Sequence, residues 1–132
     1  MSLKTWKAEF YPCDAASTEA QGAPAAHSLR KWSGVTTKNL KRHRVTLRRG
    51  GYLGGGAEGN LYLDNETCAL CHANPHTCEG CVLATVRNGV PCCNVAPGED
   101  LSPWQRASQG DSRQLLKFLR LAVKLEAAER KR

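Results

Sequence analysis

Four cysteines between residues 68 and 81 carry the strongest chemical signal in the sequence. Two residues separate Cys68 from Cys71, and two separate Cys78 from Cys81. A Cys-x2-Cys turn directs two thiolates at one ion, and two such turns complete the sulfur tetrahedron of a structural zinc site. The spacing therefore predicts one structural Zn²⁺ ion bound by these four cysteines. An iron–sulfur cluster could use the same thiolates, but no other feature of the chain indicates redox chemistry.

The fourth zinc ligand stays open between two cysteines. Asn88-Gly89 is a strong signal for a tight β-hairpin, which would bring Cys92 back to the site in place of Cys78. Cys93 follows directly and should point the other way, because adjacent residues on an extended segment face opposite sides. Cys13 lies far away in the sequence, and we interpret it as a free thiol.

Other chemistries fit the cysteine segment less well. Cys-Ala-Leu-Cys-His matches a c-type haem site, but the only methionine that could be an axial ligand is Met1. Four thiolates leave no open position for a substrate, so we expect a protein that is not an enzyme. The segment also resembles zinc-framed ββα-metal endonucleases, with His76 as the base. No acidic residue directly precedes His76, so a nuclease is only the third hypothesis.

Positive charge is concentrated in the first half of the chain. The net charge is +7, and the segment from Arg30 to Arg49 holds eight basic residues and no acidic one. Such asymmetry favours an acidic partner, and we expect nucleic acid, a nucleoprotein complex or an acidic protein surface. The residues that would bind it are Arg30, Lys31, Lys38, Lys41, Arg42, Arg44, Arg48 and Arg49.

The elements that must position these residues indicate an α+β fold. Residues 1–27 should form an N-terminal arm that is partly irregular, and residues 28–132 a single zinc-stabilised domain. The β-rich segments 45–49 and 60–64 predict strands, joined through a glycine-rich hairpin tip into a small antiparallel sheet. Two short helices around Gly34 would resemble a helix-turn-helix, although the second has only one strong apolar residue.

A long amphipathic helix is expected at the C-terminus. Apolar residues recur with helical period from about residue 112 to about residue 129, and charged residues occupy most other positions. Asp111 and Gln114 resemble a capping box at its start. The apolar face should supply much of the core, and a partner-binding or dimerising role stays open as the alternative.

The compartment follows from two sequence features. No stretch approaches the roughly 18 consecutive apolar residues of a membrane span. The first residues lack the apolar run of a secretory signal. We therefore expect a reducing, cytoplasmic environment, in which clustered cysteines bind metal more often than they form disulfides.

Several motifs follow one another in a fixed order over about residues 28–125. They are Trp32-x-Gly34, Leu40-x2-His43, the two Cys-x2-Cys turns, Gly89-x2-Cys92 and the final helix. This order resembles small cysteine-rich, zinc-binding proteins encoded by bacteriophages. The resemblance implies an accessory protein acting inside the bacterial host cell. The alternative to nucleic-acid binding is therefore inhibition of a host defence system such as CRISPR-Cas, or of another host enzyme.

Overall fold

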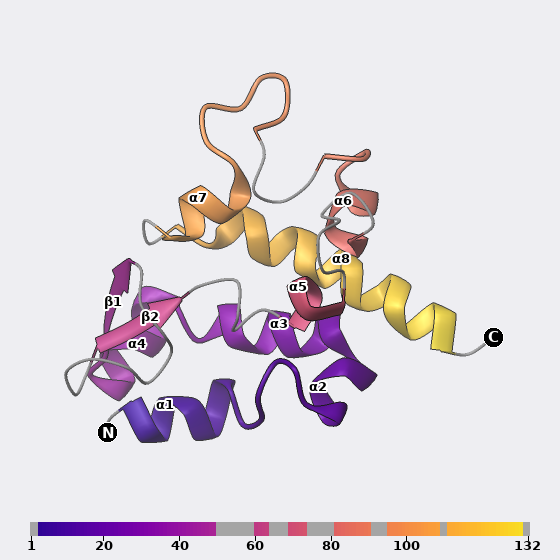
Figure 1. The fold of residues 1–132 in the computed structure, drawn as a ribbon. Helices are drawn as coiled ribbons and strands as arrows, with labels where there is room; N and C mark the ends of the chain where they lie inside the picture. The colour runs from indigo at the N-terminus through magenta and orange to yellow at the C-terminus, as the bar shows by residue number, and fades with distance from the viewer. Residues whose placement is uncertain are drawn as a thin grey trace.

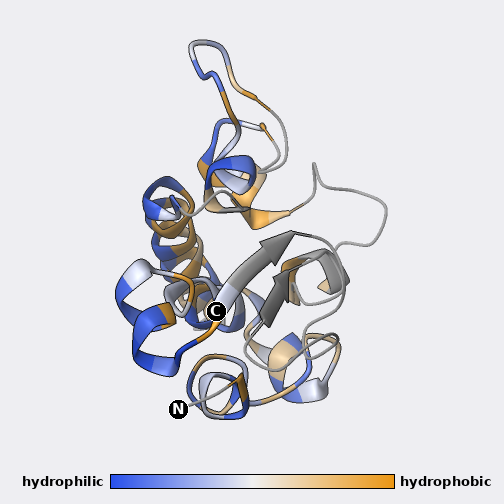
Figure 2. Cartoon of the chain, turned by 90° about the vertical axis from the view of Figure 1, so that its left-hand side faces the viewer, coloured by the Kyte–Doolittle hydropathy of each residue, from blue (hydrophilic) through white to orange (hydrophobic). Residues whose placement is uncertain are grey.

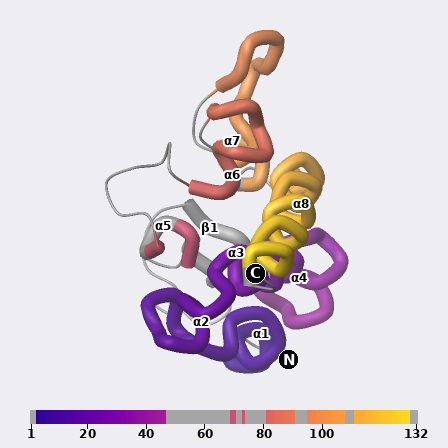
Figure 3. Tube along the Cα trace, turned by 90° about the vertical axis from the view of Figure 1, so that its right-hand side faces the viewer, coloured from indigo at the N-terminus to yellow at the C-terminus, as the bar shows by residue number. Residues whose placement is uncertain are grey.

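The computed structural model describes residues 3–49, 60–63, 69–73, 81–90, 95–108 and 111–130, and these are mostly helical (Figure 1). In chain order the elements are α1 (Leu3–Phe10), α2 (Thr18–Gly22), α3 (Pro24–Ser33), α4 (Thr37–His43), β1 (Thr46–Arg49), β2 (Asn60–Leu63), α5 (Ala69–Ala73), α6 (Val82–Val86), α7 (Pro103–Ser108) and α8 (Arg113–Arg130). Helix α8 lies beside α3, and α1 and α2 lie on the other side of α3 (Figures 1 and 3).

The predicted α+β class, with its small antiparallel sheet, is wrong. Strands form at the two expected places, but β1 and β2 have four residues each and pair in parallel, with Thr46 opposite Asn60. The rest of the described architecture is helical. No group of three His, Cys, Asp or Glu residues that could hold a metal exists among the described residues. Most of the expected zinc-stapled loop lies outside the described residues.

The hairpin expected around Asn88-Gly89 is a helix end instead. The apolar residues before it form α6, because Leu83 and Ala84 are buried and α6 packs on α8. Asn88 and Gly89 do have the positive φ angles that this pair favours, 57° and 89°. The Gly89 N–H donates to the carbonyl oxygen of Ala84 at 2.7 Å, which caps the helix. The turn that was expected to bring back Cys92 is thus absent, and Cys92 itself lies outside the described residues.

The core lies where α8 meets α3, α6 and α7. Leu115, Leu119 and Ala122 follow the helical period along one face of α8 and are buried. Trp32 of α3 is buried in the same cluster. The helices carry both hydrophilic and hydrophobic residues around their axes (Figure 2). The predicted C-terminal helix is confirmed, and its apolar face supplies much of the core.

Glu99 links three segments and accounts for a capping box that does not form. Its carboxylate accepts hydrogen bonds from Arg87 at 2.7 Å, from the Ala96 N–H at 2.8 Å and from Gln114 at 2.8 Å. These contacts, with the Ala96 N–H the largest, lower the pKa of Glu99. Because Gln114 is bound to Glu99, the expected capping box with Asp111 is absent, and Asp111 contacts Arg113 instead.

Helix α3 is capped by a residue from the other end of the chain. Its N-cap residue, Ala23, has no side-chain acceptor, and Pro24 occupies the first helical position. The carboxylate of Glu126 in α8 accepts hydrogen bonds from the N–H groups of Ala25 at 2.7 Å and Ala26 at 3.3 Å. A negative charge is favourable at the positive end of a helix dipole. Polar contacts thus join α3 to α8 in addition to the shared core.

Helix α1 covers the turn between α3 and α4. Trp6 is fully buried, and its indole N–H donates to the carbonyl oxygen of Gly34 at 2.9 Å. The ring of Phe10 lies directly on Gly34, so a Cβ atom added there would be 2.5 Å from Phe10 Cγ. The φ angle of Gly34 is −73°, which any residue can adopt. Glycine is therefore required at this position by close packing and not by backbone conformation.

We predict that Gly34→Ala destabilises the protein by about 1–3 kcal/mol, because the added methyl group must displace Phe10. Urea unfolding followed by circular dichroism measures the change. Gly22→Ala is the control, since an added Cβ at Gly22 meets no atom within 4 Å. A Gly34→Ala protein as stable as the Gly22→Ala protein would contradict the packing argument.

Candidate functional site

Helix α4 leaves α3 through a turn that side chains fix. The turn comprises residues 34–36, and Oγ1 of Thr36 accepts a hydrogen bond from the Asn39 N–H at 3.4 Å. The Asn39 side-chain amide donates to the carbonyl oxygen of Ser33 at 2.8 Å. Arg44 ends α4 in the left-handed conformation, with φ of 56°. These bonds determine the direction in which α4 projects from α3.

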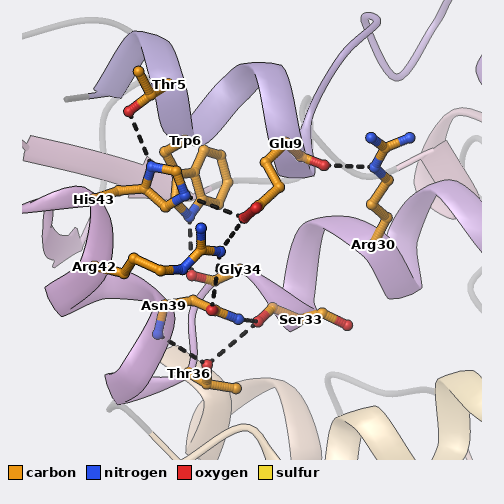
Figure 4. A network of polar contacts seen from close by, with 10 residues as sticks. All are labelled: Thr5, Trp6, Glu9, Arg30, Ser33, Gly34, Thr36, Asn39, Arg42 and His43. Carbon is orange, nitrogen blue, oxygen red and sulfur yellow. Dashed lines mark hydrogen bonds and ion pairs between the residues drawn. The ribbon is translucent and has the colours of Figure 1, made fainter. Parts of the chain in front are cut away.

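A buried histidine holds α4 against α1 (Figure 4). His43 is 2% exposed, and its Nδ1 lies 2.9 Å from Oγ1 of Thr5 while its Nε2 lies 3.1 Å from the carboxylate of Glu9. Thr5 and Glu9 are four residues apart on α1, so they face the same side of that helix. The rings of Phe10 and His43 also contact each other edge to face, nearly at right angles. Both ring nitrogens are therefore used to join the helices.

Glu9 is the acidic centre of this network. It also forms an ion pair with Arg42, whose guanidinium lies over the ring of Phe10. The Arg30 side chain donates to the carbonyl oxygen of Glu9 at 2.6 Å. The hydrogen bond from Arg42, followed by the bond from His43, lowers the pKa of Glu9, and the Glu9 contact raises the pKa of Arg42. Arg30 and Arg42 are thus both bound to α1.

The other predicted basic residues of α4 point to solvent. Lys38, Lys41 and Arg44 are exposed, and none of them forms an ion pair with a described acidic residue. Lys38 and Lys41 are three residues apart on α4 and share one side of it. Arg42 is exposed too, although it is paired with Glu9. We call Lys38, Lys41, Arg42 and Arg44 the α4 basic surface.

The remaining predicted basic residues do not all join this surface. Lys31 is 1% exposed, and its ammonium group lies 5.0 Å from the ring centre of Trp32, so it belongs to the interior. Arg48 and Arg49 are in β1, and their side chains lie outside what the structure describes. Lys4 is exposed on α1, next to Thr5. Lys4 was not among the predicted binding residues, because residues 1–27 were expected to form an arm.

Thr5, His43 and Glu9 have the residue types of a hydroxyl–imidazole–carboxylate catalytic triad. The geometry argues for a structural role instead. The ring of His43 is buried beneath α1 and α4, so a substrate has no access to it. Both of its nitrogens already contact α1, one at Thr5 and one at Glu9. We interpret the three residues as a clamp.

The structure describes the cysteines only in part. Cys81 is buried just before α6, and Cys13 is partly exposed; neither forms a disulfide. The backbone of Cys71 belongs to α5, but its side chain is not described. Cys68 and Cys78 lie outside the described residues. The zinc site predicted from these four cysteines therefore stays a prediction, as does the division of the chain after residue 27.

Comparison with known proteins yields no relative. No protein-family model, no curated protein and no solved structure matches the chain. Within the described part of the chain, no helix has the length and apolar character needed to cross a membrane. The case for a function therefore rests on the geometry and on the sequence.

Glu9→Gln should destabilise the protein near neutral pH and have less effect in acid. The contacts with Arg42 and His43 lower the folded-state pKa of Glu9, so its stabilising contribution is present above the ordinary glutamate pKa. That contribution is lost as the pH falls through the lowered value. Urea unfolding of both proteins from about pH 7 down to about pH 2 measures the difference.

The control for this experiment is Asp100→Asn, because Asp100 is exposed and forms no ion pair with a described residue. Its effect on stability should not follow the pH in the same way. A Glu9→Gln effect that is equal at all pH values would show that the ionised carboxylate does not stabilise the clamp.

Proposed function

We propose that the protein binds nucleic acid through the α4 basic surface. The observation that carries this proposal is the exposure of Lys38, Lys41 and Arg44 without an acidic partner among the described residues. Cations placed in this way attract phosphate groups, and binding releases the counterions that surround the nucleic acid. The overall charge of +7 acts in the same direction at longer range.

The clamp beneath α4 supports the proposal in a second way. His43 and Arg42 bind Glu9 from one side of α4, and this leaves Lys38 and Lys41 on a helix whose position is already fixed. A surface that is ordered before binding avoids the entropic cost of ordering its backbone on contact. Lysine is a flexible point charge, so we expect contacts to the phosphate backbone and little preference for base sequence.

Two further proposals come from the sequence and accompany this one. The two Cys-x2-Cys turns of the segment 68–81 support one structural Zn²⁺ ion. This ion would crosslink the segment and contribute free energy of folding. The resemblance to phage-encoded proteins supports a non-enzymatic accessory protein in the cytoplasm of a bacterial host. Elemental analysis of the purified protein tests the first of these proposals.

Replacement of Lys38, Lys41 and Arg44 by glutamate in one protein should nearly abolish nucleic-acid binding. Each phosphate contact that is lost should reduce the slope of log affinity against log salt by about one, so the combined change is about three. Fluorescence anisotropy with labelled duplex DNA and with labelled RNA, over a series of salt concentrations, measures both the affinity and the slope.

The matched control is the glutamate replacement of Lys117, Arg120 and Lys124, which are exposed on α8. This variant changes the net charge by the same amount at a different place. It should keep most of the salt-dependent slope. Equal loss of binding in the two variants would contradict a specific role of α4. No binding of the unaltered protein to DNA or RNA at low salt would overturn the proposed function.

A further inference from the structure

Helix α8 carries a second apolar face that the core does not use. Among the described residues, three large apolar side chains are exposed, and two of them are on α8: Leu121 at 39% and Leu125 at 40%. These two leucines are four residues apart, so they are neighbours on one side of the helix. Leu119 and Ala122, which face the core, are fully buried. With about 3.6 residues per turn, the exposed face lies about 110° around the helix from the buried one.

The exposed face has the residue spacing of a coiled coil. The a and d positions of a heptad repeat three and four residues apart. On this side of α8 they are occupied by Phe118, Leu121, Leu125 and Ala128. Ala128 is exposed, whereas Phe118 is half-buried and has the guanidinium of Arg87 over its ring, 5.6 Å from the ring centre. We call the four a and d residues the α8 stripe.

The stripe runs toward the end of α8 that the other helices leave uncovered. Glu126 contacts the first N–H groups of α3, so the residues that follow Glu126 lie beyond the start of α3. In Figure 1 the last turns of α8 project past the other described helices. The most exposed part of the stripe is therefore at the edge of the molecule, where a second helix can approach it.

The charged residues beside the stripe favour a second copy of the chain in parallel orientation. Lys117 and Lys124 precede the two a positions, and Glu129 follows the second d position. They occupy the g and e positions, which face each other across a parallel pair of helices. Lys124 then lies opposite Glu129 of the partner subunit, and twofold symmetry forms this ion pair twice. An antiparallel pair would instead bring the g positions together and oppose lysine to lysine.

Both members of this ion pair are available in the monomer. Lys124 and Glu129 are exposed, and neither forms an ion pair with another described residue. The same chain thus presents an apolar stripe together with charges that complement their own symmetry mates.

We propose that the α8 stripe binds the α8 stripe of a second copy as a short parallel coiled coil. The helix is already formed and held by the core, so association does not have to order it. The contact covers about three turns, which places it among small interfaces, and we expect a reversible dimer. This inference does not rest on the binding of nucleic acid.

Sedimentation equilibrium of the full-length protein over about a 100-fold range of concentration tests the proposal. The buffer is reducing and contains no nucleic acid, so neither disulfides nor a shared ligand can link two copies. We expect a monomer at low concentration and a dimer at high concentration. The double variant Leu121→Gln, Leu125→Gln should stay monomeric throughout, because glutamine keeps the helix propensity and removes the apolar surface.

Val95→Gln is the matched control, because Val95 is 47% exposed but does not belong to α8. This variant should dimerise like the unaltered protein. Equal loss of association in the control and in the leucine variant would contradict the role of the α8 stripe. An unaltered protein that is monomeric at the highest concentration would refute the dimer and leave the stripe to a partner of another kind.

Exchange of the two charges tests the orientation of the helices. Lys124→Glu should weaken the dimer by about 3- to 10-fold, because carboxylates would then oppose each other in both pairs. Glu129→Lys should have a similar effect, and the double variant should recover most of the original affinity. Tighter dimerisation of Lys124→Glu would reject the parallel arrangement, because only an antiparallel pair opposes the lysines. A double variant that recovers nothing would reject the ion pair.

Discussion

The contact between α1 and the turn at Gly34 is the constraint on which the rest of the N-terminal half depends. Phe10 occupies the space that a side chain at position 34 would need, and Trp6 satisfies the carbonyl group of that residue. The turn cannot move away from α1 without exposing the indole and leaving a buried polar group unpaired. The path of α4 is therefore set by this packing together with the hydrogen bonds of Thr36 and Asn39 at the turn.

Glu9 then determines which of the surrounding basic side chains are paired and which are free to contact a ligand. The carboxylate of Glu9 contacts Arg42 and His43, and its backbone carbonyl oxygen accepts a hydrogen bond from Arg30. Burial of His43 would be costly without these partners, because a buried polar ring must be hydrogen-bonded. Lys38, Lys41 and Arg44 have no such neighbour among the described residues and are exposed. Glu9, which joins α4 to α1, thus also determines which of these basic residues are paired.

The parts that could be predicted are those whose signal is long or local. The 18 residues of α8 repeat a helical pattern over several turns, so both the helix and its buried face were foreseeable. The five residues of α6 are too few to separate helix from strand, and packing on α8 decides. Charge alone could not show that Lys31 is buried while its neighbour Arg30 is exposed. The exposure of Leu121 and Leu125 depends on which side of α8 the other helices cover, so the helical period alone could not reveal it.

The cap that Glu126 provides for α3 affects the order in which the chain can fold during synthesis. Glu126 and the N–H groups that it caps are about a hundred residues apart in the sequence, so the cap can form only after α8 has been synthesised. At about 5–20 residues per second of synthesis, the first turn of α3 leaves the ribosome on the order of 5 to 20 s before its cap is made. During that interval the core cluster that contains Trp32 lacks the apolar residues of α8, Leu115, Leu119 and Ala122 among them. The start of α3 is thus translated early but obtains its cap only after α8 has been made.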